Sequence, residues 1–99
     1  MPKQIIWSPL SETDFTSILT YLQINWNDKV VQRFIEINDE ILEQISINPK
    51  QFPLIHKKKK VRKCVLTKHN TIYYRERKEF IDVLRIFDSR QDPKKLRFY

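Results

Sequence analysis

Residues 61–88 read VRKCVLTKHNTIYYRERKEFIDVLRIFD, and their pattern is the clearest indication of the fold class. It holds three runs rich in β-branched and aromatic residues, at 61–67, 71–76 and 80–88, which are separated by polar turns. Such runs are typical of consecutive antiparallel strands. Within the last run, residues 80–87 are apolar on both alternations apart from Asp82 and Arg85, which indicates a strand that is covered on both faces or central in the sheet. We therefore predict a three-stranded meander.

Two helices are predicted upstream of the meander. Apolar residues recur at i, i+3, i+4 and i+7 over residues 15–26 and again over residues 30–45, as on the buried side of a helix. Asn27 is a good cap between the two stripes, and Asn48-Pro49 ends the second helix because proline cannot continue the hydrogen-bond ladder. The short connection predicts an antiparallel helical hairpin, followed by a loop over residues 50–56.

A first strand is predicted over residues 3–8, KQIIWS, which are apolar and stand just before Pro9. The first helix begins in one of two ways. Either Ser8 is the cap with proline in the first turn, or Ser11 and Asp14 form a capping box.

Together these elements predict an α+β fold with the order β-α-α-β-β-β. We expect residues 1–99 to form a single domain. In this domain the helical hairpin packs on one face of a four-stranded, mainly antiparallel sheet, with the N-terminal strand pairing inside the sheet.

Composition narrows the class of protein. Hydrophobic residues make up 40% and charged residues 31%, which is too apolar for disorder, and no apolar run is long enough to span a bilayer. The N-terminal residues lack the features of a signal peptide, so we expect a cytoplasmic protein without a membrane partner. Cys64 is the single cysteine, and His56 and His69 have no ligands at metal spacing. We therefore expect no metal and no other cofactor.

The net charge of +7 indicates an acidic partner. Nucleic acid, an anionic membrane surface and an acidic protein all satisfy this condition, and charge alone does not choose among them. The densest positive run is Lys57–Lys60. A solvated loop is slightly favoured for this run over a phosphate contact or a protein contact.

Several motifs occur in register along the chain. Ile6-Trp7-Ser8-Pro9 leads into the first helix, Ile72-Tyr73-Tyr74-Arg75 lies in the second strand of the meander, and Ile86–Pro93 reads IFDSRQDP. Together they resemble the RelE/ParE superfamily of toxins from type II toxin–antitoxin systems. The last two look like the superfamily's IYY element and its R-Q-D-P close, and the likeness runs through nearly the whole chain.

This resemblance implies a growth-arresting toxin that a cognate acidic antitoxin neutralises in a hetero-oligomer. ParE-like members poison DNA gyrase and are not nucleases, whereas RelE-like members cut mRNA on the ribosome. A third alternative is a degenerate binding module that is no longer toxic.

The residues favour the ParE-like alternative. A metal-free ribonuclease needs convergent Arg or Lys and a titratable acid. Arg62 and Arg90 match basic positions of RelE-like toxins, and a shifted register brings in Tyr99 as the third catalytic residue. However, Cys64 and Thr71 stand where RelE-like sequences carry further basic residues.

Contacts with the antitoxin or target are expected on the open face of the sheet. One of two adjacent tyrosines faces the helices and the other faces outward, because side chains alternate along a strand. Exposed Ile and Leu of the helices are expected to add apolar anchors, whereas Trp26 is expected to pack at the helix end. The binding residues predicted in this way are Arg62, Tyr73, Tyr74, Arg75, Arg85 and Arg90.

Overall fold

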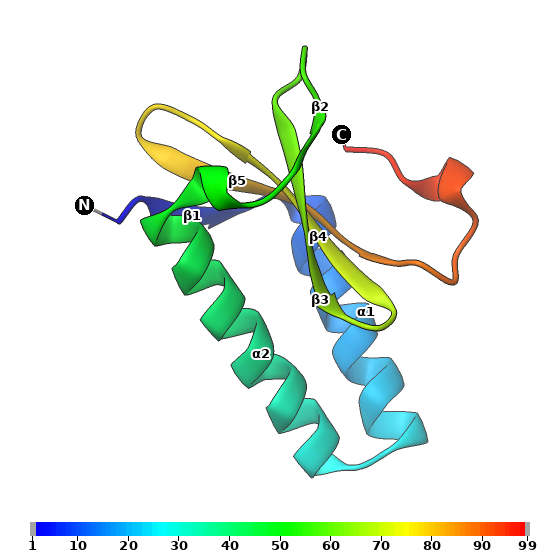
Figure 1. The fold of residues 1–99 in the computed structure, drawn as a ribbon. Helices are drawn as coiled ribbons and strands as arrows, with labels where there is room; N and C mark the ends of the chain where they lie inside the picture. Colours follow the sequence, from blue (N-terminus) through cyan, green and yellow to red (C-terminus); the bar gives the residue numbers. More distant parts are fainter. Residues whose placement is uncertain (1, 99) are drawn as a thin grey trace.

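The computed structural model describes residues 2–98 and has the predicted α+β fold, two helices followed by strands in a mixed sheet (Figure 1). In chain order the elements are β1 (Gln4–Trp7), α1 (Pro9–Asn25), α2 (Asp28–Ile47), η1 (Pro49–Gln51), β2 (Leu54–His56), β3 (Val61–Thr67), β4 (Asn70–Glu76), β5 (Phe80–Asp88) and η2 (Pro93–Lys95). The two η elements are short 3-10 helices.

The sheet has five strands in the order β1-β5-β4-β3-β2, so the prediction of four strands was wrong by one. The segment predicted as the loop 50–56 contains the short edge strand β2, which pairs antiparallel with β3. The residues of β2 are all exposed. Because neither face of this strand is buried, its sequence does not alternate between polar and apolar residues.

The prediction that the N-terminal strand pairs inside the sheet was also wrong. This strand, β1, lies at the edge and runs parallel to β5. The end of α2 covers its outer side, where the N–H of Lys3 donates to the carbonyl of Ser46 and the Ser46 hydroxyl donates to the carbonyl of Lys3. These bonds satisfy both backbone groups of Lys3, the residue directly before β1, and so fasten the start of this edge to α2.

The predicted helix ends are confirmed. Ser8 is the N-cap of α1, since its Oγ accepts from the N–H of Ser11 at 3.1 Å with Pro9 in the first turn. Asn27 caps α2 by accepting from the N–H of Val30 at 3.1 Å. The second helix ends at Ile47, directly before the Asn-Pro pair.

The core lies between α2 and the helix-facing side of the sheet. Tyr74 is fully buried there, and its hydroxyl donates to the carbonyl of Pro49 at 2.6 Å. Burial raises the pKa of Tyr74 far above its ordinary value, so the hydroxyl stays protonated. Residues from four elements, α2, β3, β4 and β5, share this core, and they are Phe34, Leu42, Ile45, Cys64, Leu66, Ile72, Tyr74, Ile81, Val83 and Ile86.

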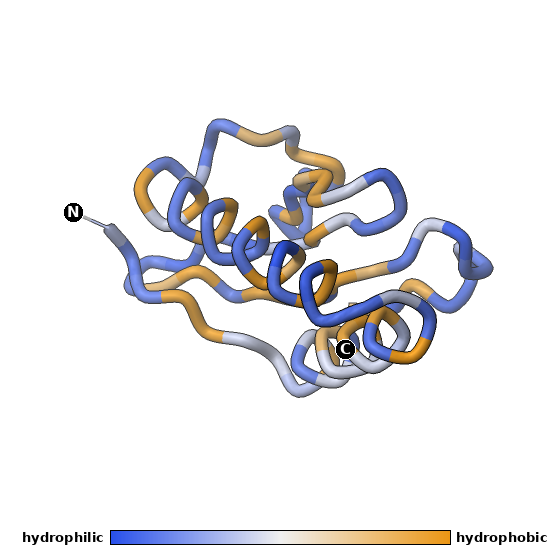
Figure 2. Tube along the Cα trace, turned by 90° about the horizontal axis from the view of Figure 1, so that it is seen from below, coloured by the Kyte–Doolittle hydropathy of each residue, from blue (hydrophilic) through white to orange (hydrophobic). Residues whose placement is uncertain are grey.

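The two helices differ in how they distribute their apolar residues. Hydrophobic and hydrophilic stretches alternate along both helical coils (Figure 2). In α2 the apolar residues gather on the buried side, as in an ordinary amphipathic helix. In α1, by contrast, Phe15 and Leu22 pack towards the core, while Tyr21, Ile24 and the C-cap residue Trp26 are exposed. The first helix therefore carries apolar surface that its own chain does not cover.

Candidate functional site

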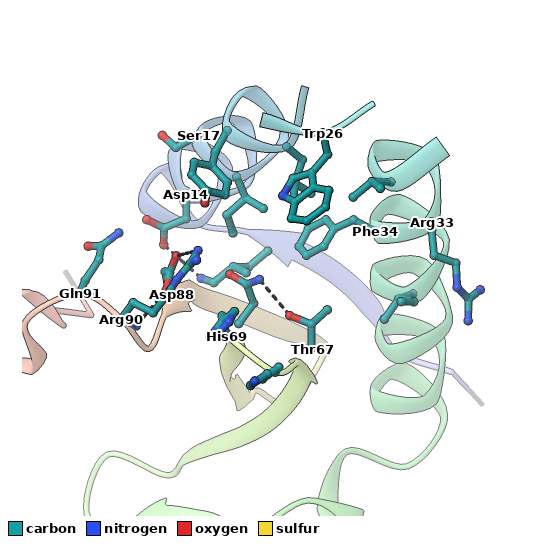
Figure 3. Close-up of a pocket in the computed structure, with 18 of the residues that line it drawn as sticks. Asp14, Ser17, Trp26, Arg33, Phe34, Thr67, His69, Asp88, Arg90 and Gln91 are labelled. Carbon is teal, nitrogen blue, oxygen red and sulfur yellow. Dashed lines mark hydrogen bonds and ion pairs between the residues drawn. The ribbon is translucent and has the colours of Figure 1, made fainter. Parts of the chain in front are cut away.

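A groove opens between α1, α2 and the tip of the β3–β4 hairpin (Figure 3). Its volume is about 690 Å³, which is in the usual range of ligand sites. The apolar lining comes from Ile18 and Leu22 of α1, Phe34 and Ile37 of α2, and Ile86 of β5. The groove is thus an extension of the core to the surface, on the helix-facing side of the sheet.

Two aromatic side chains of α1 stand over this groove. Trp26 is 64% exposed and Tyr21 is 44% exposed, and both line the groove. The prediction that Trp26 packs at the helix end was therefore wrong. This residue caps α1 at the tip of the helical hairpin, where the helical stripe has run past the sheet that would bury it.

The rim of the groove is positive. Lys29 and Arg33 of α2, Lys68 of the β3–β4 turn and Arg90 after β5 all line it. Two carboxylates, Asp14 and Asp88, also line the groove, but each is bonded to an arginine. The Asp88 pair also cancels the charge of Arg90, and Arg33 lies 3.5 Å from Glu36, so Lys29 and Lys68 supply the unbalanced positive charge around the apolar floor.

Arg90 is held at one edge of the groove. Its Nε donates to Oδ1 of Asp88 at 3.0 Å and its Nη2 donates to Oδ2 at 2.7 Å, which is a bidentate pair. These hydrogen bonds hold the pKa of Asp88 below its ordinary value, so the carboxylate stays ionised. The guanidinium also lies 5.3 Å from the ring centroid of Tyr21, in the range of a cation–π contact. Among the binding residues predicted from the sequence, only Arg90 lines the groove.

Arg85 has a structural role that was not predicted. Its Nε and Nη2 donate to both oxygens of Asp14 at 2.7 and 2.9 Å, and its Nη1 donates to the carbonyl of Arg97 at 2.7 Å. The N–H of Ile86 also donates to Asp14, at 3.1 Å. The pairing of β1 with β5 ends at Val83, so β1 offers no acceptor to the N–H of Ile86. The carboxylate of Asp14 accepts this hydrogen bond instead. The two residues tie α1 to β5 across 71 positions of sequence.

The other predicted residues divide between the two faces of the sheet, since Tyr73 lies opposite Arg85 on the open face whereas Tyr74 is in the core. Arg62 lies opposite Tyr74 in the register, so both are on the helix-facing side. The guanidinium of Arg62 donates to the carbonyl of Phe52 at 2.8 Å. Tyr73 is on the open face, as the alternation predicts, with its ring 5.6 Å from that of Phe98.

Two further positions remain, Arg75 of the predicted binding set and Cys64, which bears on the ribonuclease alternative. Arg75 is paired with Asp82 at 3.2 Å on the open face. Cys64 is buried, which raises the pKa of its thiol and keeps it protonated. The remaining candidate, Tyr99, lies outside the described residues.

Residues 2–98 hold neither a metal-binding cluster nor a membrane-spanning helix. No cluster of three His, Cys, Asp or Glu side chains with metal-binding geometry is found in that range. Neither of the two long helices in it has the combination of length and hydropathy that a membrane span requires.

Comparisons with known proteins identify the family of the chain and a solved structure of similar fold. A model of the ParE toxin family, from the type II toxin–antitoxin system parDE, matches residues 5–93. A solved structure described as "Chromosomal ParDE TA system from P. aeruginosa" is similar in fold, with a TM-score of 0.73 and 15% identity. The similarity covers 87% of this chain and 95% of that one. No curated protein matches the chain in sequence.

Proposed function

Because the chain belongs to the ParE toxin family of type II toxin–antitoxin systems, we propose that it arrests bacterial growth by inhibiting DNA gyrase. The family match over residues 5–93 is the observation that carries this proposal. We further propose that the chain acts in the cytoplasm and that a cognate antitoxin neutralises it by occupying the groove.

The groove supports neutralisation by an acidic, amphipathic segment. Its floor is apolar, and Tyr21 and Trp26 present two aromatic anchors beside it. Interfaces bury such anchors at their centre and keep charged residues at the rim. A helix that inserts apolar residues between α1 and α2 would contact the apolar floor of the groove. Its carboxylates would face Lys29 and Arg33 at the positive rim.

Gyrase inhibition is favoured over ribonuclease activity because the basic residues are already engaged. Arg62 bonds a backbone carbonyl on the helix-facing side, and Arg85 is held by Asp14. Thr71 and the protonated Cys64 stand at positions where RelE-like toxins carry basic side chains. A metal-free ribonuclease needs, beside its general acid and base, positively charged side chains that are free to contact the RNA phosphate.

Induction of the chain in a bacterial host is expected to stop growth, and co-expression of its neighbouring gene is expected to restore it. Because gyrase poisoning leaves broken DNA, the arrested cells should form filaments and switch on the DNA-damage response. The control is the same vector with an early stop codon in the reading frame. Normal growth with folded protein confirmed in the cells would contradict the proposal and favour the degenerate binding module.

A further inference from the structure

A second charged surface lies at the other end of the sheet from the groove. The β2–β3 turn, residues 57–60, and the β4–β5 turn, residues 77–79, flank a shallow cleft of about 710 Å³. In Figure 1 the β2–β3 turn stands at the top of the molecule and the β3–β4 turn, beside the groove, lies at the lower end of the sheet. Seven-residue strands separate the two ends, a distance of roughly 20 Å.

The two turns concentrate positive charge. They carry six Lys or Arg residues and one carboxylate, Glu79, and all of these residues are exposed. The neighbouring Glu76 is already bonded to Lys3 at 2.8 Å, so it offsets little of this charge. The cleft is therefore a focused positive field rather than a mixture of both signs.

The β2–β3 turn has a defined backbone shape. The N–H of Lys59 donates to Nδ1 of His56 at 3.0 Å, and Lys60 adopts the left-handed conformation with φ of 57°. A side-chain bond of this kind fixes a turn in the way that Asn or Asp side chains do. The four lysines thus emerge from a structured turn that faces the Arg77-Lys78 turn across the cleft.

We propose that these two turns bind the phosphate backbone of a nucleic-acid duplex without reading its sequence. Lysines neutralise phosphates as point charges and release counterions, and they do not require a particular base. The lining of the cleft is entirely polar or charged, whereas a protein interface needs an apolar centre and a membrane surface needs apolar residues to insert. The lining holds no Phe, Tyr or Trp on which single strands would stack, and its one aromatic ring, His56, is tied into the turn by the N–H of Lys59.

This surface and the groove can be occupied together, because they lie at opposite ends of β3 and β4. Duplex binding is therefore compatible with either a free or a neutralised chain. It does not depend on gyrase being the target.

The test compares two triple variants that each remove three exposed lysines. K58Q/K60Q/K78Q changes three lysines that line the cleft, and K50Q/K94Q/K95Q is the matched control elsewhere on the surface. Binding of the full chain to fluorescent 20-base-pair DNA and RNA duplexes is measured by anisotropy over a series of salt concentrations. We expect the cleft variant to bind at least about tenfold more weakly at low salt, with a salt slope lower by about 2 to 3. The control should retain most of the affinity and slope.

Binding of either duplex that is weakened in the cleft variant and retained in the control supports the proposal, and the duplex bound more tightly identifies the natural source of the phosphates. Equal losses in both variants would overturn it, because they would mean that total charge alone attracts the duplex. Absence of binding by the unaltered chain at low salt would also overturn it. Polyglutamate of equal charge that competes as well as the duplex would instead assign the surface to an acidic protein.

Discussion

Replacing Trp26 by alanine is expected to weaken the complex with the cognate antitoxin by about 2–4 kcal/mol, or roughly 30- to 1000-fold in affinity. Trp26 is 64% exposed in the isolated chain and stands over the apolar floor of the groove. An exposed tryptophan beside a groove provides much apolar area for a partner and loses little conformational entropy on binding. The loss should appear mainly as faster dissociation, which surface plasmon resonance measures directly.

The chain offers a matched control on the same helix. Ile24 is 76% exposed, more than Trp26, but it does not line the groove. The Ile24→Ala variant should therefore bind the antitoxin with nearly unchanged affinity, and both variants should fold, since neither side chain is buried. Equal effects of the two substitutions, or no effect of Trp26→Ala, would place the antitoxin elsewhere.

The Asp14→Ala substitution is expected to destabilise the fold by about 3–5 kcal/mol, the usual cost of removing one partner from a buried ion pair. The side chains of Asp14 and Arg85 are only 16% and 11% exposed. Without Asp14, the guanidinium of Arg85 loses two bonds and the N–H of Ile86 loses its acceptor. For a domain of this size the midpoint of thermal unfolding should fall by at least about 12 °C.

Thermal and urea unfolding of three variants separate the ion pair from other effects. Glu12→Ala also removes a carboxylate near the start of α1, but Glu12 is exposed, so the expected loss is below about 1 kcal/mol. The double variant Asp14→Leu with Arg85→Met should recover much of the stability, because it replaces the pair with apolar groups. If Asp14→Ala unfolds at the same temperature as Glu12→Ala, the pair is not what ties α1 to β5.

Local patterns predicted most of the fold. The helix ends depend on Ser8, Asn27 and Asn48-Pro49, whose effects act within a few residues, so the sequence is sufficient to place them. The strand β2 was missed because its residues are all exposed and leave no periodicity. The position of β1 at the edge depends on α2 covering it, which is a tertiary contact.

The candidate site was less predictable for the same physical reason. Asp14 and Arg85 meet across 71 positions, and no local pattern marks such a pair. Trp26 has the helical spacing of a buried residue, but it lies beyond the end of the sheet that would cover it. The periodicity of a helix does not show where the neighbouring sheet ends. One signal was present in the sequence: Tyr21 is an aromatic residue off the buried stripe of α1, and in the structure it is exposed and lines the groove.

Inhibition of purified DNA gyrase is the most direct test of the proposed function. Relaxed plasmid, gyrase and ATP are incubated with increasing amounts of the folded chain, with and without the antitoxin. Supercoiling is predicted to fall with the dose while cleaved plasmid accumulates, and the antitoxin should reverse both effects. Unchanged supercoiling at a large excess of the chain, with mRNA cleaved on translating ribosomes by the same preparation, would contradict it.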